Sequence, residues 1–326
     1  MNKKVGYAIA LALALAAPFY GYPVFLMKLL CFALFACAFN LLIGYTGLLS
    51  FGHAAFFGGA GYVTGYALRT WGWPTELGLL AGVATGAFLG LVMGGLAIRR
   101  QGIYFTMITL ALAQMVYFLA LRLPFTGGED GLQGVPRGTL LGTIDLGNDT
   151  VLYYLVLAIF IAGFALIVRT IHSPFGQVLK AIKENEPRAI SLGYDVNKYK
   201  LMAIVLSASL AALAGATKTL VLGFETLTDV YWGMSGLVVL MTLVGGMGTL
   251  AGPIIGAVLI IALENKLGDV GLFLASHTGV EWFGTLGESV GIVTGIIFVI
   301  CVLMFRRGIV GEAIARFGNR AAKPTA

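Results

Sequence analysis

Long apolar segments alternate with short polar interruptions along almost the whole chain. A helix needs roughly 20 apolar residues to cross the hydrocarbon core of a membrane, and fewer where protein surrounds it. The pattern predicts about ten transmembrane or re-entrant helices, at approximately 5–20, 24–43, 52–70, 77–98, 103–122, 151–169, 200–222, 234–247, 250–264 and 286–305. We expect an all-α polytopic membrane protein whose residues 1–326 form a single transmembrane domain.

The basic residues are divided unevenly between the two sides of the membrane that these segments define. Cytoplasmic loops of membrane proteins carry an excess of lysine and arginine. With the N-terminus inside, 15 of the 21 basic residues lie on the cytoplasmic side: Lys3, Lys4, Arg99, Arg100, Arg169, Lys180, Lys183, Arg188, Lys198, Lys200, Arg306, Arg307, Arg316, Arg320 and Lys323. The bias predicts that both ends are cytoplasmic, with residues 306–326 as a tail. Lys218 falls near an outer end, where a long side chain can reach the interface.

The first segment also has features of a cleavable signal peptide. Lys3 and Lys4 precede an apolar run, and the small residues Ala14, Ala16 and Ala17 follow it. We expect this segment to be retained as a membrane helix. Either outcome leaves the next segment starting on the outer side.

Composition supports the membrane interpretation. Hydrophobic residues are 59% of the chain, charged residues are 11% and mean hydropathy is +0.92, which is more apolar than a soluble core requires. The net charge of +6 lies in short loops and forms no aromatic-interleaved patch, so we expect no nucleic-acid partner and a lipid bilayer as surroundings. Cys31, Cys37 and Cys301 fall inside apolar segments and indicate packed core residues.

The longest charged interval covers residues 171–200. Ser173 followed by a proline is typical of a helix start, and Pro187 can open a second short helix. Gly193 follows at the position where a helix commonly ends with one residue in the left-handed backbone conformation, which favours glycine. Asn197 is positioned to cap the next apolar segment. The interval predicts two short helices in a polar surface, either a solvated loop or a docking surface.

Two outer segments are also polar. Residues 124–150 are rich in turn-forming glycine and proline, which excludes a long helix, and their acids either meet a partner or keep the loop solvated. Residues 265–285 predict an interfacial loop or half-helix.

Glycines interrupt two apolar segments, at positions 44–65 and 245–256. A glycine within a helix costs up to about 1 kcal/mol relative to alanine, so both segments are expected to be broken or tightly packed. Interruptions in corresponding halves are typical of inverted repeats with a translocation path between them, whereas close helix packing uses the same residues. The candidate path residues are Gly44, Tyr45, Gly47, Ser50, Gly52, His53, Gly245, Gly246 and Gly248.

Few polar side chains fall within the spans. His53 is either a packed, hydrogen-bonded residue or a functional ionisable group, and the Ser and Thr residues are expected to bond neighbouring helices. The spans show no carboxylate at mid-membrane, which argues against ion coupling.

The chain contains no phosphate-binding G-x-x-x-x-G-K-[ST] loop and no H-E-x-x-H, and its histidines at 53, 172 and 277 assemble no catalytic set. We therefore do not expect an enzyme.

Two stretches carry resemblances to known families. The acids, alanine and glycine of the 171–200 interval resemble the EAA loop of ATP-binding cassette importer permeases, with Pro187 and Arg188 as departures from the pattern. Residues 40–62 (NLLIGYTGLLSFGHAAFFGGAGY) and 245–258 (GGMGTLAGPIIGAV) resemble branched-chain amino acid transporter permeases of the LivM type. By this resemblance Glu184, Glu186, Ala189 and Gly193 couple the permease to an ATPase.

The resemblance implies a permease subunit in a bacterial inner membrane. It implies a second homologous (LivH-type) permease chain, two cytoplasmic ATPase subunits and a periplasmic substrate-binding protein as partners. No cofactor is expected on this chain, since ATP and Mg would be used by the ATPases. The alternatives are a permease for urea or short amides, a secondary transporter or channel that needs no ATPase, and a membrane enzyme dependent on His53.

Overall fold

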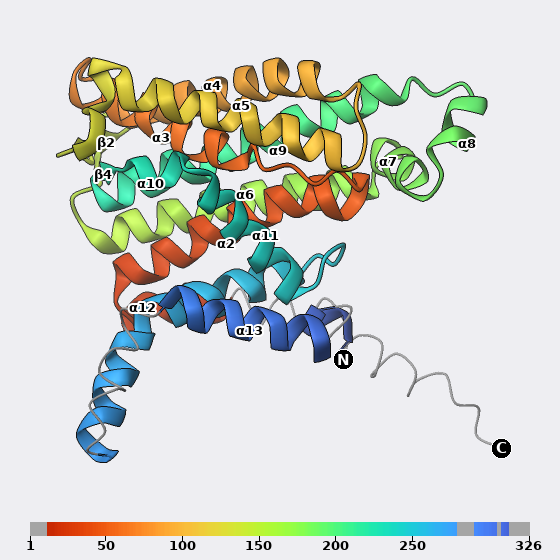
Figure 1. Cartoon of the computed structure of the whole chain (residues 1–326). Coiled ribbons are helices and arrows are strands. Elements are labelled where there is room, and N and C mark those ends of the chain that lie inside the picture. The colour runs from red at the N-terminus through yellow and green to blue at the C-terminus, as the bar shows by residue number, and fades with distance from the viewer. Residues whose placement is uncertain (1–11, 279–289, 305–307, 313–326) are drawn as a thin grey trace.

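The computed structural model describes residues 12–278, 290–304 and 308–312. Its long helices run side by side in a bundle (Figure 1). The helices are α2 (Pro23–Thr46), α3 (His53–Arg69), α4 (Thr75–Ala97), α5 (Ile103–Arg122), α6 (Asp149–His172), α7 (Pro174–Glu184), α8 (Glu186–Ser191), α9 (Val196–Leu222), α10 (Leu227–Val230), α11 (Trp232–Gly245), α12 (Gly252–Thr278) and α13 (Val290–Met304). Nine predicted segments, from 24–43 onwards, each coincide with one of these helices. Most of the first segment lies outside the described residues, although 12–16 are helical.

Five of the described helices are long and apolar enough to cross a membrane: α2, α4, α5, α6 and α9. Helices α3 and α11 are shorter, with 17 and 14 residues, because the chain breaks before one and after the other. The breaks fall at residues 47–52 and 246–251, within the two predicted glycine-rich interruptions. The predicted helical membrane fold is confirmed. The predicted number of ten spans is not, because five of the described helices are long and apolar enough for a full span.

Helices α2 and α9 form the centre of the bundle. Every α2 residue from Cys31 to Thr46 is buried, and α9 packs across α2, α3 and α4. Helix α4 approaches α9 through glycines spaced four apart, and a β-carbon at Gly86 would collide with Ala212. Small residues at this spacing let two helix backbones approach closely in a membrane.

The two ends of the bundle differ in character (Figure 1). Helices α7 and α8 project from one end, which we call the α7 end. The opposite end, the strand end, carries two short antiparallel pairs: β1 (Leu132–Gln133) with β4 (Phe224–Glu225), and β2 (Thr139–Leu140) with β3 (Ile144–Asp145). Between α5 and α6 lie only the 3₁₀ turns η2 (Pro124–Thr126) and η3 (Gly128–Asp130) and the strands β1, β2 and β3, as the turn-rich composition predicted.

Helix α12 corrects one sequence prediction. The apolar pattern ended the segment at 264 and assigned 265–285 to a loop or half-helix, whereas α12 continues to Thr278. The Asn265 side-chain amide donates to the Ile261 carbonyl at 2.8 Å, one turn back, so this polar residue is satisfied inside the helix. Residues 279–289 lie outside the described part of the chain, as does most of the predicted tail 306–326.

Candidate functional site

The polar segment 171–200 forms the two short helices that the sequence predicts. Ser173 caps α7, its hydroxyl oxygen accepting from the Gly176 N–H at 3.3 Å, with proline in the first turn. Leu179 and Ile182 are buried against the bundle, so α7 is held by its apolar face. The opposite face of α7 stays in solvent, as expected of an amphipathic helix.

Helix α8 has a capped start and a glycine beyond its end. Asn185 caps its start through the Arg188 N–H at 3.1 Å, and Ala189 is buried. Gly193 lies beyond the end with φ +86°, the left-handed conformation that favours glycine. The cap of α9 differs from the prediction: Asp195, not Asn197, accepts from the Lys198 N–H at 3.3 Å, because the helix begins earlier, at Val196.

The two predicted coupling acids lie in different environments. Glu184 is exposed at the end of α7. Glu186 pairs with Lys200 on α9 at 2.6 Å, and that lysine is buried. The Glu186–Lys200 ion pair holds α8 against α9, so Glu186 has a structural partner within the chain whereas Glu184 is presented outward.

Large apolar side chains are exposed around the end of α8. Ile190 is 57% exposed and Leu192 is 68% exposed, with Tyr194 beside them in sequence. We call Ile190, Leu192 and Tyr194 the α8 patch. These residues belong to the polar segment between the apolar helices α6 and α9. Exposed apolar side chains rimmed by polar ones are typical of protein–protein contact sites.

Helix α7 packs against the first glycine-rich interruption. The Lys183 ammonium donates to the Gly44 carbonyl oxygen at 2.6 Å, near the last turn of α2. A β-carbon at Gly47, where φ is +76°, would lie 3.2 Å from the Lys183 side chain. Lys180 lies over the Tyr45 ring, 5.9 Å from its centroid. Three predicted path residues are therefore in direct contact with α7.

The first interruption also contacts the second. Asn40 binds the turn between α11 and α12 from both sides of its amide: it donates to the Thr249 carbonyl and accepts from the Gly248 N–H, each at 2.9 Å. A β-carbon at Gly44 would lie 2.9 Å from the Gly248 nitrogen. Gly245, the last residue of α11, lies against the Gly252 carbonyl at the start of α12. The structure thus brings Gly44 against Gly248, whereas Gly245 packs against α12 and Gly246 follows it at the end of α11.

Ser50, Gly52 and His53 lie apart from that contact. A β-carbon at Gly52 would meet Met93 on α4 at 2.8 Å, so this part of the interruption packs towards α4 and α5. His53 is fully buried, with Nε2 2.9 Å from the Ser207 hydroxyl and its ring edge-on to Phe39. This environment favours the packed alternative for His53, while its other ring nitrogen has no partner among the described residues.

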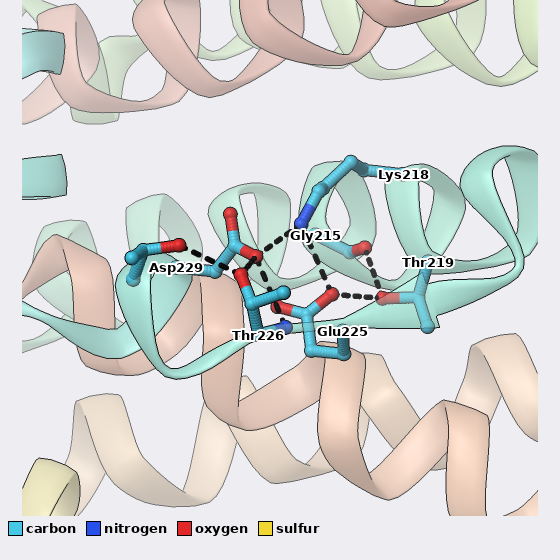
Figure 2. A network of polar contacts seen from close by, with 7 residues as sticks. Gly215, Lys218, Thr219, Glu225, Thr226 and Asp229 are labelled. Atoms are coloured by element: carbon cyan, nitrogen blue, oxygen red, sulfur yellow. Dashed lines mark hydrogen bonds and ion pairs between the residues drawn. The ribbon is translucent and has the colours of Figure 1, made fainter. Parts of the chain in front are cut away.

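Sequence reasoning missed a buried ionic cluster at the strand end. Lys218 on α9 pairs with Glu225 on β4 at 3.3 Å and with Asp229 on α10 (Figure 2). The prediction that Lys218 reaches the interface is wrong, because its side chain is 4% exposed and both its carboxylate partners are buried as well. The local signal was the sequence FETLTD, in which Thr226 and Asp229 form a capping box, but nothing local shows that the acids are buried. Among the described residues no group of His, Cys, Asp and Glu is arranged to hold a metal ion.

A bundle with five apolar helices long enough to cross a membrane is the architecture of a multi-pass membrane protein. Residues 23–303 match the family described as branched-chain amino acid transport system / permease component. The chain therefore belongs to this family of transport permeases, and it is an inner-membrane protein.

Curated relatives agree with that assignment. The chain is 26% identical over 300 residues to the high-affinity branched-chain amino acid transport system permease protein LivM of Escherichia coli, covering 82% of this chain and 69% of the relative. It is 32% identical over 197 residues to the autoinducer 2 import system permease protein LsrC of Klebsiella pneumoniae, covering 57% and 53%. Among solved structures, PsaBC from Streptococcus pneumoniae in complex with Fab aligns with a TM-score of 0.39 and 18% identity, covering 85% of this chain and 91% of that chain.

Proposed function

We propose that this chain is the permease subunit of an ATP-driven importer for branched-chain or other hydrophobic amino acids. The observation that carries the proposal is the continuous contact from the α8 patch to the glycine-rich interruptions. The patch offers a docking surface, α7 joins it to the bundle, and Lys183 joins α7 to Gly44. Asn40 and Gly248 extend the contact to the second interruption.

In the proposed assembly the α7 end faces the cytoplasm. One of the two ATPase subunits binds there, with Glu184 and the α8 patch in its groove and Ala189 and Gly193 shaping the surface that it contacts, and the other ATPase binds the second permease chain. A second, homologous permease chain completes the membrane part, and a periplasmic binding protein delivers substrate to the strand end. ATP and Mg are used by the ATPases, and this chain binds no cofactor.

Transport in this proposal alternates between outward-facing and inward-facing states. ATP-driven closure of the ATPases displaces α7 and α8, because their exposed face is the docking surface. The displacement reaches the inner end of α2 through Lys183 and Gly44, and then the α11–α12 turn through Asn40. Packed interfaces of this kind switch between discrete arrangements rather than deform continuously, so both glycine-rich breaks move together.

The substrate is the part of the proposal that the residues constrain least. The relatives named above carry different substrates in their names, a branched-chain amino acid and autoinducer 2. Urea and short amides therefore remain alternative substrates for the same permease architecture. Selectivity is then expected to lie with the soluble binding protein.

Affinity purification of the tagged full chain from its native membrane tests the proposed class. We expect two ATP-binding cassette subunits and a second permease chain to copurify, and the reconstituted complex to import leucine only when ATP and the binding protein are present. An ATPase-independent transporter predicts instead that the chain purifies alone and transports leucine under an ion gradient. That result would contradict the importer, and the failure of leucine with success of another small amide would change only the substrate.

A further inference from the structure

The ionic cluster at the strand end has an imbalance of charge. It contains one ammonium, on Lys218, and two carboxylates, on Glu225 and Asp229, which are 3%, 0% and 5% exposed. With all three groups ionised the cluster would carry a net charge of −1 inside the protein. Burying an uncompensated charge is strongly unfavourable, and a carboxyl group avoids that cost by binding a proton.

Asp229 is equipped to remain ionised. Its Oδ2 accepts from the Lys218 ammonium, from the Thr226 hydroxyl at 2.7 Å and from the Thr226 N–H at 3.3 Å. Hydrogen bonds donated to the charged form of a carboxylate stabilise that form. Asp229 and Lys218 therefore make a neutral pair, and the excess charge falls on Glu225.

Glu225 lacks comparable support. Its Oε2 lies 3.3 Å from the Lys218 ammonium and 2.5 Å from the Thr219 hydroxyl (Figure 2). Its Oε1 is buried without a hydrogen-bond partner among the described residues. An unpartnered buried oxygen is costly on a carboxylate and less so on the carbonyl of a neutral acid.

The hydrogens on Thr219 favour the same conclusion. Its single hydroxyl hydrogen has two acceptors within reach, the Gly215 carbonyl at 3.1 Å and Glu225 Oε2 at 2.5 Å. A proton on Glu225 Oε2 resolves this competition, because Glu225 then donates to Thr219 and Thr219 donates to Gly215. In that arrangement both short contacts of the Thr219 hydroxyl are hydrogen bonds, whereas an ionised Glu225 would leave one of the two without a hydrogen.

The backbone of α3 lies close to the Glu225 carboxyl group. A β-carbon at Gly61 on α3 would lie 2.5 Å from the Glu225 carboxyl carbon, so the α3 backbone closes directly over it. The titratable groups that face the cluster are Tyr62 on α3 and Cys31 on α2, Tyr117 on α5 lies near Tyr62, and β1 contributes the non-titrating Leu132 and Gln133. Burial raises the pKa of Glu225 to about 8, against a smaller opposing effect of Lys218.

We propose that Glu225 is a proton-binding site at the strand end, holding one proton while β4 is paired with β1 and covered by α3. When this end opens, water reaches the carboxyl group and the O–H bond on Oε2 breaks. The proton passes to the outer aqueous phase, and closure of the same end takes up one proton again. Protonation itself follows from the cluster alone, and only its timing within a transport cycle rests on the proposed function.

Infrared difference spectroscopy of the purified full chain near neutral pH tests the site directly. Subtracting the spectrum of Glu225→Gln from that of the wild type is expected to leave the carbonyl band of one protonated carboxylic acid. The matched control is Glu129→Gln, which changes an exposed acid of η3 at the same end, and its difference spectrum should lack that band. Raising the pH through about 8 should remove the band from the wild type.

A second variant separates protonation from a general effect of mutation. Asp229→Asn removes one carboxylate, so an ionised Glu225 would then neutralise Lys218, and the band should disappear although Glu225 is still present. Absence of a band in the wild-type difference, or its persistence in Asp229→Asn, would overturn the proposal. So would failure of Glu225→Gln to accumulate as folded protein, since glutamine mimics a protonated glutamate. None of these outcomes depends on whether ATPase subunits copurify.

Discussion

The Lys183 ammonium lies 2.6 Å from the Gly44 carbonyl oxygen, across 139 residues of sequence. The acceptor belongs to the last turn of α2, where helix carbonyls lack intrahelical partners and carry partial negative charge. A cation at this position therefore caps α2 and attaches α7 to it. Because α2 is buried from Cys31 to Thr46, a displacement of α7 acts on the centre of the bundle.

Replacing Lys183 with methionine should uncouple docking from transport. The change keeps the side-chain length and removes the charged donor, whose bond to a carbonyl is worth roughly 1.5–3 kcal/mol. We expect ATPase subunits to copurify normally while ATP-driven import falls about tenfold or more, with partial recovery in Lys183→Arg. The control is Lys198→Met, which removes an exposed cation paired with Asp195 and should leave import unchanged. Equal import by the two methionine variants would contradict the role of Lys183.

Gly193→Val should weaken ATPase association. Gly193 has φ +86°, which a β-branched residue resists, and no atom lies close enough to clash, so strain in the backbone is the main effect. We expect membrane insertion to persist while the yield of copurified ATPase drops several-fold. Gly72→Val is the matched control, because Gly72 also has positive φ and open space around it but lies between α3 and α4, at the strand end. Normal ATPase recovery with Gly193→Val would count against docking at α8.

The hydrophobic pattern was sufficient for much of this fold. It located nine helices and both breaks, because apolar length and clustered glycines are local properties of the sequence. The caps at Ser173 and Gly193 were predictable for the same reason, since proline, serine and glycine have strong positional preferences at helix ends. Asn265 shows the limit of such a pattern: a polar residue marked a helix end, whereas its amide bonds the preceding turn and the helix continues.

The contacts that define the candidate site are non-local, and the sequence pattern could not provide them. The Asn40–Gly248 hydrogen bond joins residues 208 positions apart, and the burial of Glu225 depends on α3 lying over β4. In the sequence, Glu225 and Asp229 follow an apolar segment and have the composition of a solvated loop. Only the folded chain shows that Lys218 turns inward to meet them.

Gly44→Ala should destabilise the protein by about 1–3 kcal/mol, the usual cost of overpacking. A β-carbon there would collide with the Asn40 side chain and lie 2.9 Å from the Gly248 nitrogen, so the contact between the two breaks must open. Gly95→Ala on α4 provides a matched control, because no atom lies within 4 Å of its β-carbon position. That change should be neutral or stabilising, by up to about 1 kcal/mol, since alanine favours helix. Thermal denaturation in detergent compares them, and similar melting temperatures would show that the breaks are not in tight contact.

Disrupting the Glu186–Lys200 pair should release α8 from the bundle. Lys200 is buried, whereas the Glu186 side chain is 20% exposed, so removing the carboxylate leaves a buried ammonium without its partner. We expect Glu186→Gln to destabilise the protein by roughly 1–3 kcal/mol and Lys200→Met to cost less, because methionine fills the buried site without charge. Glu184→Gln, on the exposed neighbouring acid, should leave the melting temperature unchanged. A larger loss for Glu184→Gln than for Glu186→Gln would reverse the structural assignment of the two acids.

The raised pKa of Glu225 predicts how stability depends on pH. Burial raises its pKa from the ordinary 4.5 to about 8, so between these values the folded protein binds a proton that the unfolded chain has lost. Stability must then fall as pH increases through this window, by up to about 1.4 kcal/mol per pH unit, and become independent of this group above it. Glu225→Gln carries no titrating proton and should show a flatter profile over the same range. Thermal denaturation of both proteins at several pH values measures the difference, and parallel profiles would mean that Glu225 is already ionised in the folded state.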